Sequence, residues 1–152
     1  MIELFKFRIE MRIPFEDVDL FRLLHNAKYF SYFEKCRFEY LRNLGLIYGE
    51  ESLPNVECAV VEHFCSYKKP ARYDDVIEFL VRVSYIRRSS LQFQYILRRK
   101  GDEQVLTTGY TNLVWVNFET GKPKTIPPHI KDPVVEFEGD NLNKMPGNPV
   151  VK

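Results

Sequence analysis

Hydrophobic and charged residues alternate strictly at the start of the chain. Over residues 5–13 every odd position is Phe, Ile or Met, and every even position is Lys, Arg or Glu. A period of two predicts a strand with one buried face and one solvated face. Pro14 should end this strand, because proline cannot donate a hydrogen bond to a neighbouring strand.

A different period follows. From Asn26 to Leu44 the chain has no Gly or Pro, and hydrophobic residues recur every three or four positions. This pattern predicts one long helix that is hydrophobic over more than half its circumference, which is typical of a helix at the centre of a core. Asn26 suits the N-cap and Gly45 the C′ position.

Four further strand-like segments come after a loop at residues 46–56. The turn signals between them are Ser89-Ser90 and Lys100-Gly101-Asp102. One helix and five strands predict an α+β fold, in which a five-stranded antiparallel sheet curls around the helix. The four segments are residues 57–67, 76–86, 91–98 and 105–118.

The last part of the chain is rich in proline and carries two glycines. We expect a single domain over residues 1–130 and an irregular tail over residues 131–152. Within that tail, residues 134–137 could dock as a short strand.

Composition narrows the class of protein. The 152 residues carry a net charge of +1, which suggests one domain and argues against a general nucleic-acid binder. Three cysteines without CxxC spacing suggest neither disulfides nor a zinc site, and the three histidines are too scattered to suggest a metal centre. With no signal peptide or membrane helix in the sequence, we expect a reduced, soluble, cytoplasmic protein.

Candidate chemistry lies just before the predicted helix. Asp17 and Asp19 precede a helix start, whose unpaired amides can stabilise an oxyanion. A carboxylate there can attack a polarised carbonyl or activate water. Spacing alone favours the simpler interpretation, in which both residues are loop acids that are preferred near a helix N-terminus.

This segment resembles the signature of hotdog-fold acyl-coenzyme A (acyl-CoA) thioesterases, in the 4-hydroxybenzoyl-CoA thioesterase-like group. The matching motif is D-x-D, then N-A-x-Y, then F-E and Arg along the helix. Later landmarks at residues 67–75, 87–90 and 117–123 also match, so that the resemblance covers about residues 5–130. The motif residues are Asp17, Asp19, Asn26, Ala27, Tyr29, Phe33, Glu34 and Arg37.

The resemblance implies a function and a site. It implies hydrolysis of acyl-CoA to a free acid and CoA, with Asp19 as nucleophile or general base and the backbone amide of Asn26 polarising the carbonyl. No cofactor is implied, since CoA arrives as part of the substrate. Relatives generally have Gly at the position of Arg22, so we expect the loop either to take another path and shape a different acyl pocket, or to lose the site.

A basic turn is the candidate for the nucleotide part of the substrate. Arg87 and Arg88, next to Ser89 and Ser90, can bind CoA phosphates, because a guanidinium group can form two parallel hydrogen bonds to a phosphate. An ordinary solvated turn is the equal alternative.

Two other functions stay open, an acyl carrier protein thioesterase and a non-catalytic acyl-CoA-binding module. Because a long open sheet edge is rarely tolerated, and similar proteins pair sheets edge to edge with the thioester channel between subunits, we expect a homodimer or homotetramer.

Overall fold

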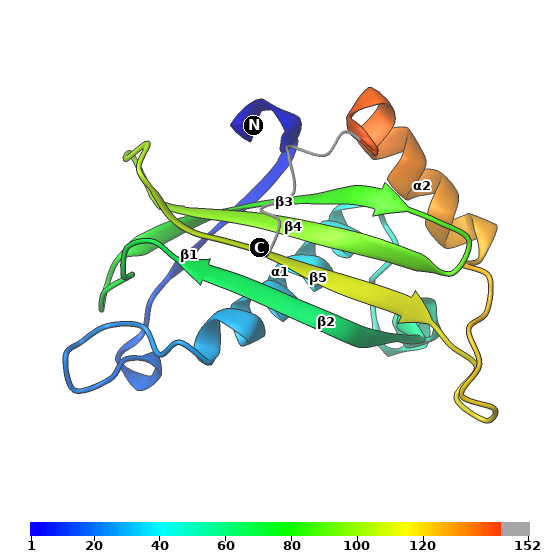
Figure 1. Cartoon of the computed structure of the whole chain (residues 1–152), viewed down its shortest axis with the longest axis horizontal. Coiled ribbons are helices and arrows are strands. Elements are labelled where there is room, and N and C mark those ends of the chain that lie inside the picture. Colours follow the sequence, from blue (N-terminus) through cyan, green and yellow to red (C-terminus); the bar gives the residue numbers. More distant parts are fainter. Residues whose placement is uncertain (144–152) are drawn as a thin grey trace, which may run out of the picture.

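A five-stranded antiparallel sheet and one long helix dominate the computed structural model, which describes residues 1–143 (Figure 1). Every predicted strand is present, with its ends within three residues of the predicted ones. The predicted α+β class and the five-stranded sheet are therefore confirmed. The strands are β1 (Phe7–Arg12), β2 (Cys58–Tyr67), β3 (Val76–Ile86), β4 (Ser90–Arg99) and β5 (Val105–Trp115).

The sheet has two edges of different character. Its strand order is β1-β3-β4-β5-β2, so among the described residues β1 and β2 each have one unpaired side. The short strand β1 exposes charged side chains at every second position, a pattern that discourages further pairing. The ten-residue strand β2 instead exposes Val60 and Val61. The edge at β2 is therefore the one suited to pair with another chain.

The long helix α1 (Lys28–Asn43) packs against one face of the sheet. Phe33 stacks face to face on Tyr95 of β4, with ring centroids 4.0 Å apart. Gly109 of β5 allows this approach, because a Cβ there would lie 2.7 Å from the Phe33 ring and 2.6 Å from the carbonyl oxygen of Phe64. A side chain at position 109 would therefore push the helix off the sheet.

The start of α1 differs from the prediction. The N-cap residue is Ala27, and no side chain caps the helix. The Asn26 side chain turns back on its own neighbour, where its Oδ1 accepts the N–H of Ala27 at 2.8 Å. The prediction of Asn26 as N-cap is thus wrong, whereas Gly45 has the expected left-handed conformation at the C-terminal end, with φ of 73°.

A second helix, α2 (Pro128–Glu138), replaces the predicted irregular chain. Pro128 occupies its first turn, where proline is tolerated because that N–H has no helical partner. Ile130 and Val134, one turn apart, are buried. The predictions of an irregular segment from residue 131 and of a short strand at 134–137 are therefore wrong; residues 144–152 of the predicted tail lie outside the described residues.

The end of α2 is fixed by a buried carboxyl group. Glu138 Oε1 accepts the Tyr40 hydroxyl at 2.6 Å and the N–H of Val83 at 2.8 Å. These bonds join α2 to both α1 and β3. Within residues 1–143, no helix is long and apolar enough to span a membrane.

Candidate active site

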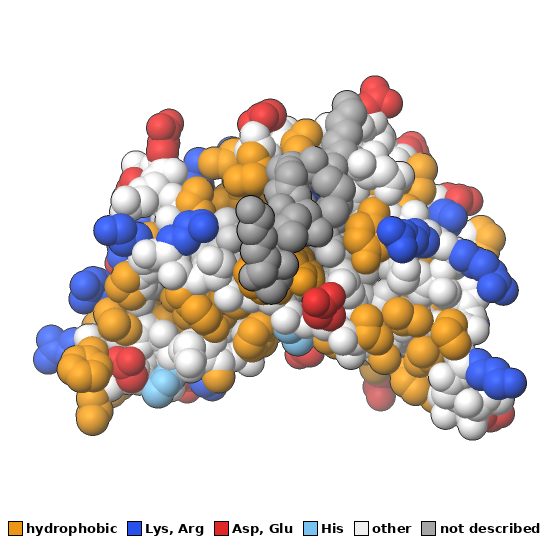
Figure 2. Space-filling model, viewed as in Figure 1, with side chains coloured by type: hydrophobic (Ala, Val, Ile, Leu, Met, Phe, Trp, Pro, Cys, Tyr) orange, Lys and Arg blue, Asp and Glu red, His pale blue; other side chains and the backbone are white. Residues whose placement is uncertain are grey.

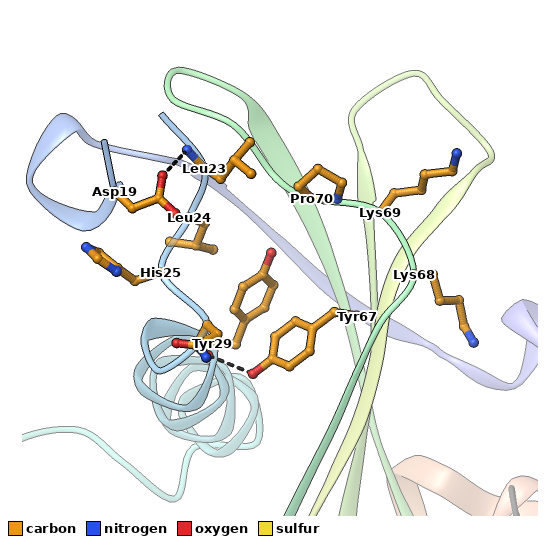
Figure 3. Close-up of a pocket in the computed structure, with 10 residues that line it drawn as sticks. Asp19, Leu23, Leu24, His25, Tyr29, Tyr67, Lys68, Lys69 and Pro70 are labelled. Carbon is orange, nitrogen blue, oxygen red and sulfur yellow. Dashed lines mark hydrogen bonds between the residues drawn. The ribbon is translucent and has the colours of Figure 1, made fainter. Parts of the chain in front are cut away.

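A cavity of about 550 Å³ lies at the N-terminal end of α1 (Figure 3). The loop before the helix forms one wall, and the end of β2 with the residues after it forms the other. Asp19 and Asn26, the two predicted catalytic residues, both line this cavity. Its lining residues are Asp19, Leu23, Leu24, His25, Asn26, Tyr29, Tyr67, Lys68, Lys69 and Pro70.

The Asp19 carboxylate is anchored by the backbone of its own loop. Its Oδ1 accepts the N–H of Phe21 at 2.8 Å and that of Leu23 at 3.1 Å. The Asp19 N–H in turn donates to the Leu23 carbonyl at 2.9 Å. Within residues 1–143 no hydrogen bond reaches Oδ2, so one oxygen holds the turn and the other is available for chemistry.

Arg22 forms the sharp point of the same turn. Its φ is 62°, in the left-handed region that favours glycine, at a cost of about 1–2 kcal/mol for other residues. The arginine accepts this conformation and does not abolish the turn. Its carbonyl accepts the N–H of Tyr73 at 2.9 Å, and Leu23 bridges to Arg72. These contacts hold the strained turn against the loop that follows β2.

The peptide group of Asn26 is fixed through its carbonyl oxygen, whereas its N–H has no acceptor among the described residues. Its carbonyl oxygen accepts the Tyr67 hydroxyl at 2.8 Å (Figure 3). The next amide, that of Ala27, is occupied by the Asn26 side chain. Among the described residues no acceptor receives the N–H of Asn26, so this donor is free to bind an oxygen of a ligand.

Asp17 is buried, and its carboxylate is bound by other side chains of the fold. It is 8% exposed, its Oδ2 accepts the Tyr32 hydroxyl at 2.6 Å, and Lys28 Nζ lies 3.4 Å from its Oδ1. The hydrogen bond from Tyr32, followed by the contacts of Lys28, lowers the pKa of Asp17 below its ordinary value of 3.8. Its carbonyl accepts the N–H of His25 at 3.0 Å, so Asp17 supports the loop from beneath.

Two tyrosines that were not predicted as site residues form the inner wall of the cavity. The rings of Tyr29 and Tyr67 meet edge to face, with centroids 4.9 Å apart. Burial raises the pKa of both hydroxyls, so they are hydrogen-bond donors at neutral pH. Tyr29 belongs to the N-A-x-Y motif, which was the only signal that could have pointed to it. The His25 ring and the Lys68 and Lys69 side chains point away from this wall (Figure 3).

The basic turn lies far from this cavity in the same chain. Tyr67 and Leu97 both pair with Thr107 at the cavity end of the sheet, whereas Ser90 pairs with Val114. Seven residue steps along β4 therefore separate the two ends, or about 24 Å at 3.4 Å per residue. A single chain does not bring Arg87–Ser90 to Asp19 and Asn26.

The side chains of the basic turn are partly engaged. The Arg87 guanidinium lies over the Tyr85 ring, 4.9 Å from its centroid. Arg88 Nε donates to Thr125 Oγ1 at 3.1 Å, and the Ser89 carbonyl accepts the N–H of Trp115. Both arginines remain exposed, so their outer N–H groups can still meet a phosphate.

Comparisons with known proteins match most of the chain. A family model described as the thioesterase-like superfamily matches residues 13–134. A putative esterase of Aquifex aeolicus is 29% identical over 119 residues, which are 78% of this chain and 90% of that protein. The acyl-CoA thioester hydrolase YbgC of Escherichia coli is 29% identical over 133 residues, 87% of this chain and 96% of YbgC.

Solved structures agree with these matches. A thioesterase from Thermus thermophilus, crystallised with coenzyme A and Zn, superposes with a TM-score of 0.76 at 26% identity. The superposition covers 90% of this chain and 97% of the other. The resemblance read from the sequence and the hotdog fold that it implied are both confirmed.

Proposed function

Because the chain belongs to the thioesterase-like superfamily, we propose that it hydrolyses acyl-CoA thioesters to a free acid and CoA. The observation that carries this proposal is the meeting of Asp19 and the Asn26 amide in one cavity. Within residues 1–143, one group supplies an unengaged carboxylate oxygen, and the other supplies an unengaged N–H at a helix start. Thioester hydrolysis needs both, a nucleophile or base on one side of the carbonyl and an oxyanion donor on the other.

The reaction follows from these two positions. Asp19 Oδ2 takes a proton from water, and the water oxygen attacks the thioester carbon while the carbonyl oxygen accepts the N–H of Asn26. The C–S bond then breaks, and the thiolate of CoA leaves and takes up the proton. Direct attack by Asp19 on the same carbon, giving a mixed anhydride that water hydrolyses, uses the same geometry. Tyr67 has a positioning role, because its hydroxyl fixes the Asn26 peptide.

The complete site, in our proposal, needs two subunits. Antiparallel pairing of two β2 edges, Cys58–Tyr67, about a two-fold axis through the middle of the strand would place Cys58 of one chain opposite Tyr67 of the other. The far end of one sheet, which carries Arg87 and Arg88, then lies beside the Asn26 cavity of the other sheet. This assembly would bring CoA phosphates to the arginines and the thioester to Asp19, with the homodimer as the smallest active unit and a homotetramer as a pair of them. The unpaired cysteines fit a reducing, cytoplasmic location.

The proposal is tested by kinetics with matched variants. The full-length protein is assayed with a panel of acyl-CoA esters by detection of the released thiol. We expect Asp19→Asn to lower kcat by about 10²–10⁴-fold, as for other acid–base groups. Asp17→Asn is the matched control, since Asp17 faces Tyr32 and Lys28, and it should leave kcat within a few-fold of wild type.

Two results would overturn the proposal. Asp19→Asn with wild-type turnover would remove Asp19 from the reaction. A wild-type protein that binds acyl-CoA yet releases no thiol from any ester would instead indicate a non-catalytic acyl-CoA-binding module.

A further inference from the structure

Two exposed hydrophobic features lie at opposite ends of the open edge of β2. At the cavity end is the turn tip, which we define as Leu20 and Phe21; Leu20 is wholly exposed and Phe21 is 81% exposed. At the other end is the hairpin that follows β5, residues 116–123, which carries Phe118 at 66% exposure. Figure 1 shows the turn and the hairpin projecting beyond the edge of β2 at its opposite ends. In the space-filling view of Figure 2, the outline of the molecule is hollowed between these two corners.

The turn tip is a rigid feature. Asp19 Oδ1 binds two amides of the turn, and Arg22 is held in a left-handed conformation at its point. A strained turn that persists is one that its surroundings determine. The chain thus presents two large hydrophobic side chains outward on a fixed backbone, which is typical of a contact surface rather than of a loose loop.

The opposite hairpin is equally well fixed. Asn117 Oδ1 accepts the N–H groups of Glu119 and Thr120, at 2.9 and 3.2 Å. The Asn117 N–H donates to the Lys122 carbonyl at 2.9 Å, so Phe118 is carried on a closed turn. In both features the backbone that carries the hydrophobic side chains is therefore fixed by hydrogen bonds within the chain.

We propose that the turn tip of one subunit docks on the 116–123 hairpin of a second copy of this chain, and so walls the thioester site. The inference rests on the dimer of the proposed function. A two-fold axis through the β2 edge brings the Tyr67 end of one chain to the Cys58 end of the other, so each tip meets one hairpin, twice per dimer. Leu20 and Phe21 directly follow Asp19, which makes the docked tip a wall of the composite cavity.

A second copy fits the tip better than an unrelated partner. The two hydrophobic features flank one unpaired strand, and a single symmetry operation covers the strand and both features together. Covering a large hydrophobic side chain is favourable by an amount that corresponds to roughly tenfold in affinity or more. Each contact, made twice in the dimer, therefore has a measurable effect on assembly.

The first experiment measures the dimer dissociation constant by sedimentation equilibrium. For the full chain carrying Leu20→Ser and Phe21→Ser we expect this constant to rise at least tenfold. Phe118→Ser should also raise it, and adding Phe118→Ser to the tip variant should raise it less than the product of the two effects, because one contact is already lost. Val135→Ser, an exposed hydrophobic residue on α2, is the matched control and should leave the constant unchanged.

The second experiment identifies what the tip touches. A photo-reactive benzophenone analogue replaces Phe21, and isotopically mixed subunits reveal cross-links between chains. We expect cross-links to the 116–123 hairpin of the partner subunit. Cross-links within one chain alone, or a dissociation constant that the tip variants do not change, would overturn the docking. Binding of the tip to phospholipid vesicles without any effect on the dimer would do the same. Thiol release by the wild type and its loss in Asp19→Asn test the proposed function separately from either result.

Discussion

Two tyrosine–carboxylate hydrogen bonds of equal length allow a test of how the protonation of a carboxyl group changes the stability of the fold. Tyr32 donates to Asp17 and Tyr40 donates to Glu138, each at 2.6 Å between oxygens. Their carboxyl groups have opposite pKa directions. The hydrogen bond from Tyr32 lowers the pKa of Asp17 below 3.8, whereas burial raises the pKa of Glu138 above 4.5.

The sign of each contribution follows from linkage. Asp17 stabilises the fold above pH 3.8, and its contribution is lost as the pH falls through its lowered folded-state pKa. Glu138 behaves in the opposite way: the folded state holds its proton more tightly, so its contribution is present below pH 4.5 and is lost as the pH rises through its raised pKa. Asp17 should therefore be ionised over a wider range of pH than Glu138.

Tyr32→Phe removes one hydroxyl and keeps the stacking of the ring on Phe79. A hydrogen bond to a charged group contributes about 1.5–3 kcal/mol, and one between neutral groups about 0.5–1.5 kcal/mol. We expect Tyr32→Phe to lower the free energy of unfolding at pH 7 by about 1.5–3 kcal/mol. The loss should shrink by about half once the pH is below the folded-state pKa of Asp17.

Urea unfolding across a pH series measures both variants. On acidification, the cost of Tyr40→Phe should fall first, while the pH is still above 4.5, and the cost of Tyr32→Phe should fall only below pH 3.8. Equal m-values would show that the unfolded states are comparable. If the two costs fall at the same pH, or in the reverse order, the assignment of opposite pKa directions is wrong.

Further predictions concern the loop and the basic turn. Arg22→Gly should leave stability unchanged or raise it by up to about 1 kcal/mol in urea unfolding, because glycine adopts the left-handed conformation without strain but loses more entropy on folding. Arg22→Val should lower stability by at least about 1 kcal/mol, since a β-branched residue is strained there. Arg87→Ala with Arg88→Ala should raise KM for acyl-CoA with little change in kcat, and the effect should shrink for a short thioester that lacks the nucleotide. If the double variant raises KM equally for acyl-CoA and for the short thioester, the two arginines have a structural role.

The sheet could be predicted from the sequence because its strands alternate in hydrophobicity and are bounded by turn residues. The helix α2 could not, since Pro128 and Pro133 argue locally against it. Packing overrides that local preference: Ile130 and Val134 are buried on the body of the fold, and Glu138 is bonded to α1 and β3. The two bonds of Glu138 join residues 98 and 55 positions apart, which no local pattern reveals.

The same difference between local patterns and long-range contacts explains why only part of the candidate site could be predicted. Asp19 and Asn26 are seven residues apart, and one turn brings both to the helix start, so their meeting is a local property. The position of Arg87 depends on which end of the sheet holds the turn between β3 and β4. That end is fixed by the antiparallel pairing of β1 with β3, where Phe7 lies opposite Val81 and Arg12 opposite Val76. Hydrophobic periodicity does not reveal that β1 pairs with β3, because the long helix lies between them in the sequence. The distance between the basic turn and the cavity with Asp19 and Asn26 therefore became known only from the structure.

The two carboxylate oxygens of Asp19 allow the proposed catalytic role and a structural role to share one residue. Oδ1 holds the turn through the amides of Phe21 and Leu23, and Oδ2 is left for chemistry. Asn keeps an oxygen for the two amides and replaces the other with a group that can neither attack a carbonyl nor take a proton. Alanine removes both, so a loss of activity in Asp19→Ala would not distinguish a collapsed turn from a missing carboxylate. The asparagine variant separates the two roles, because the structural role uses Oδ1 and the proposed catalytic role would use Oδ2.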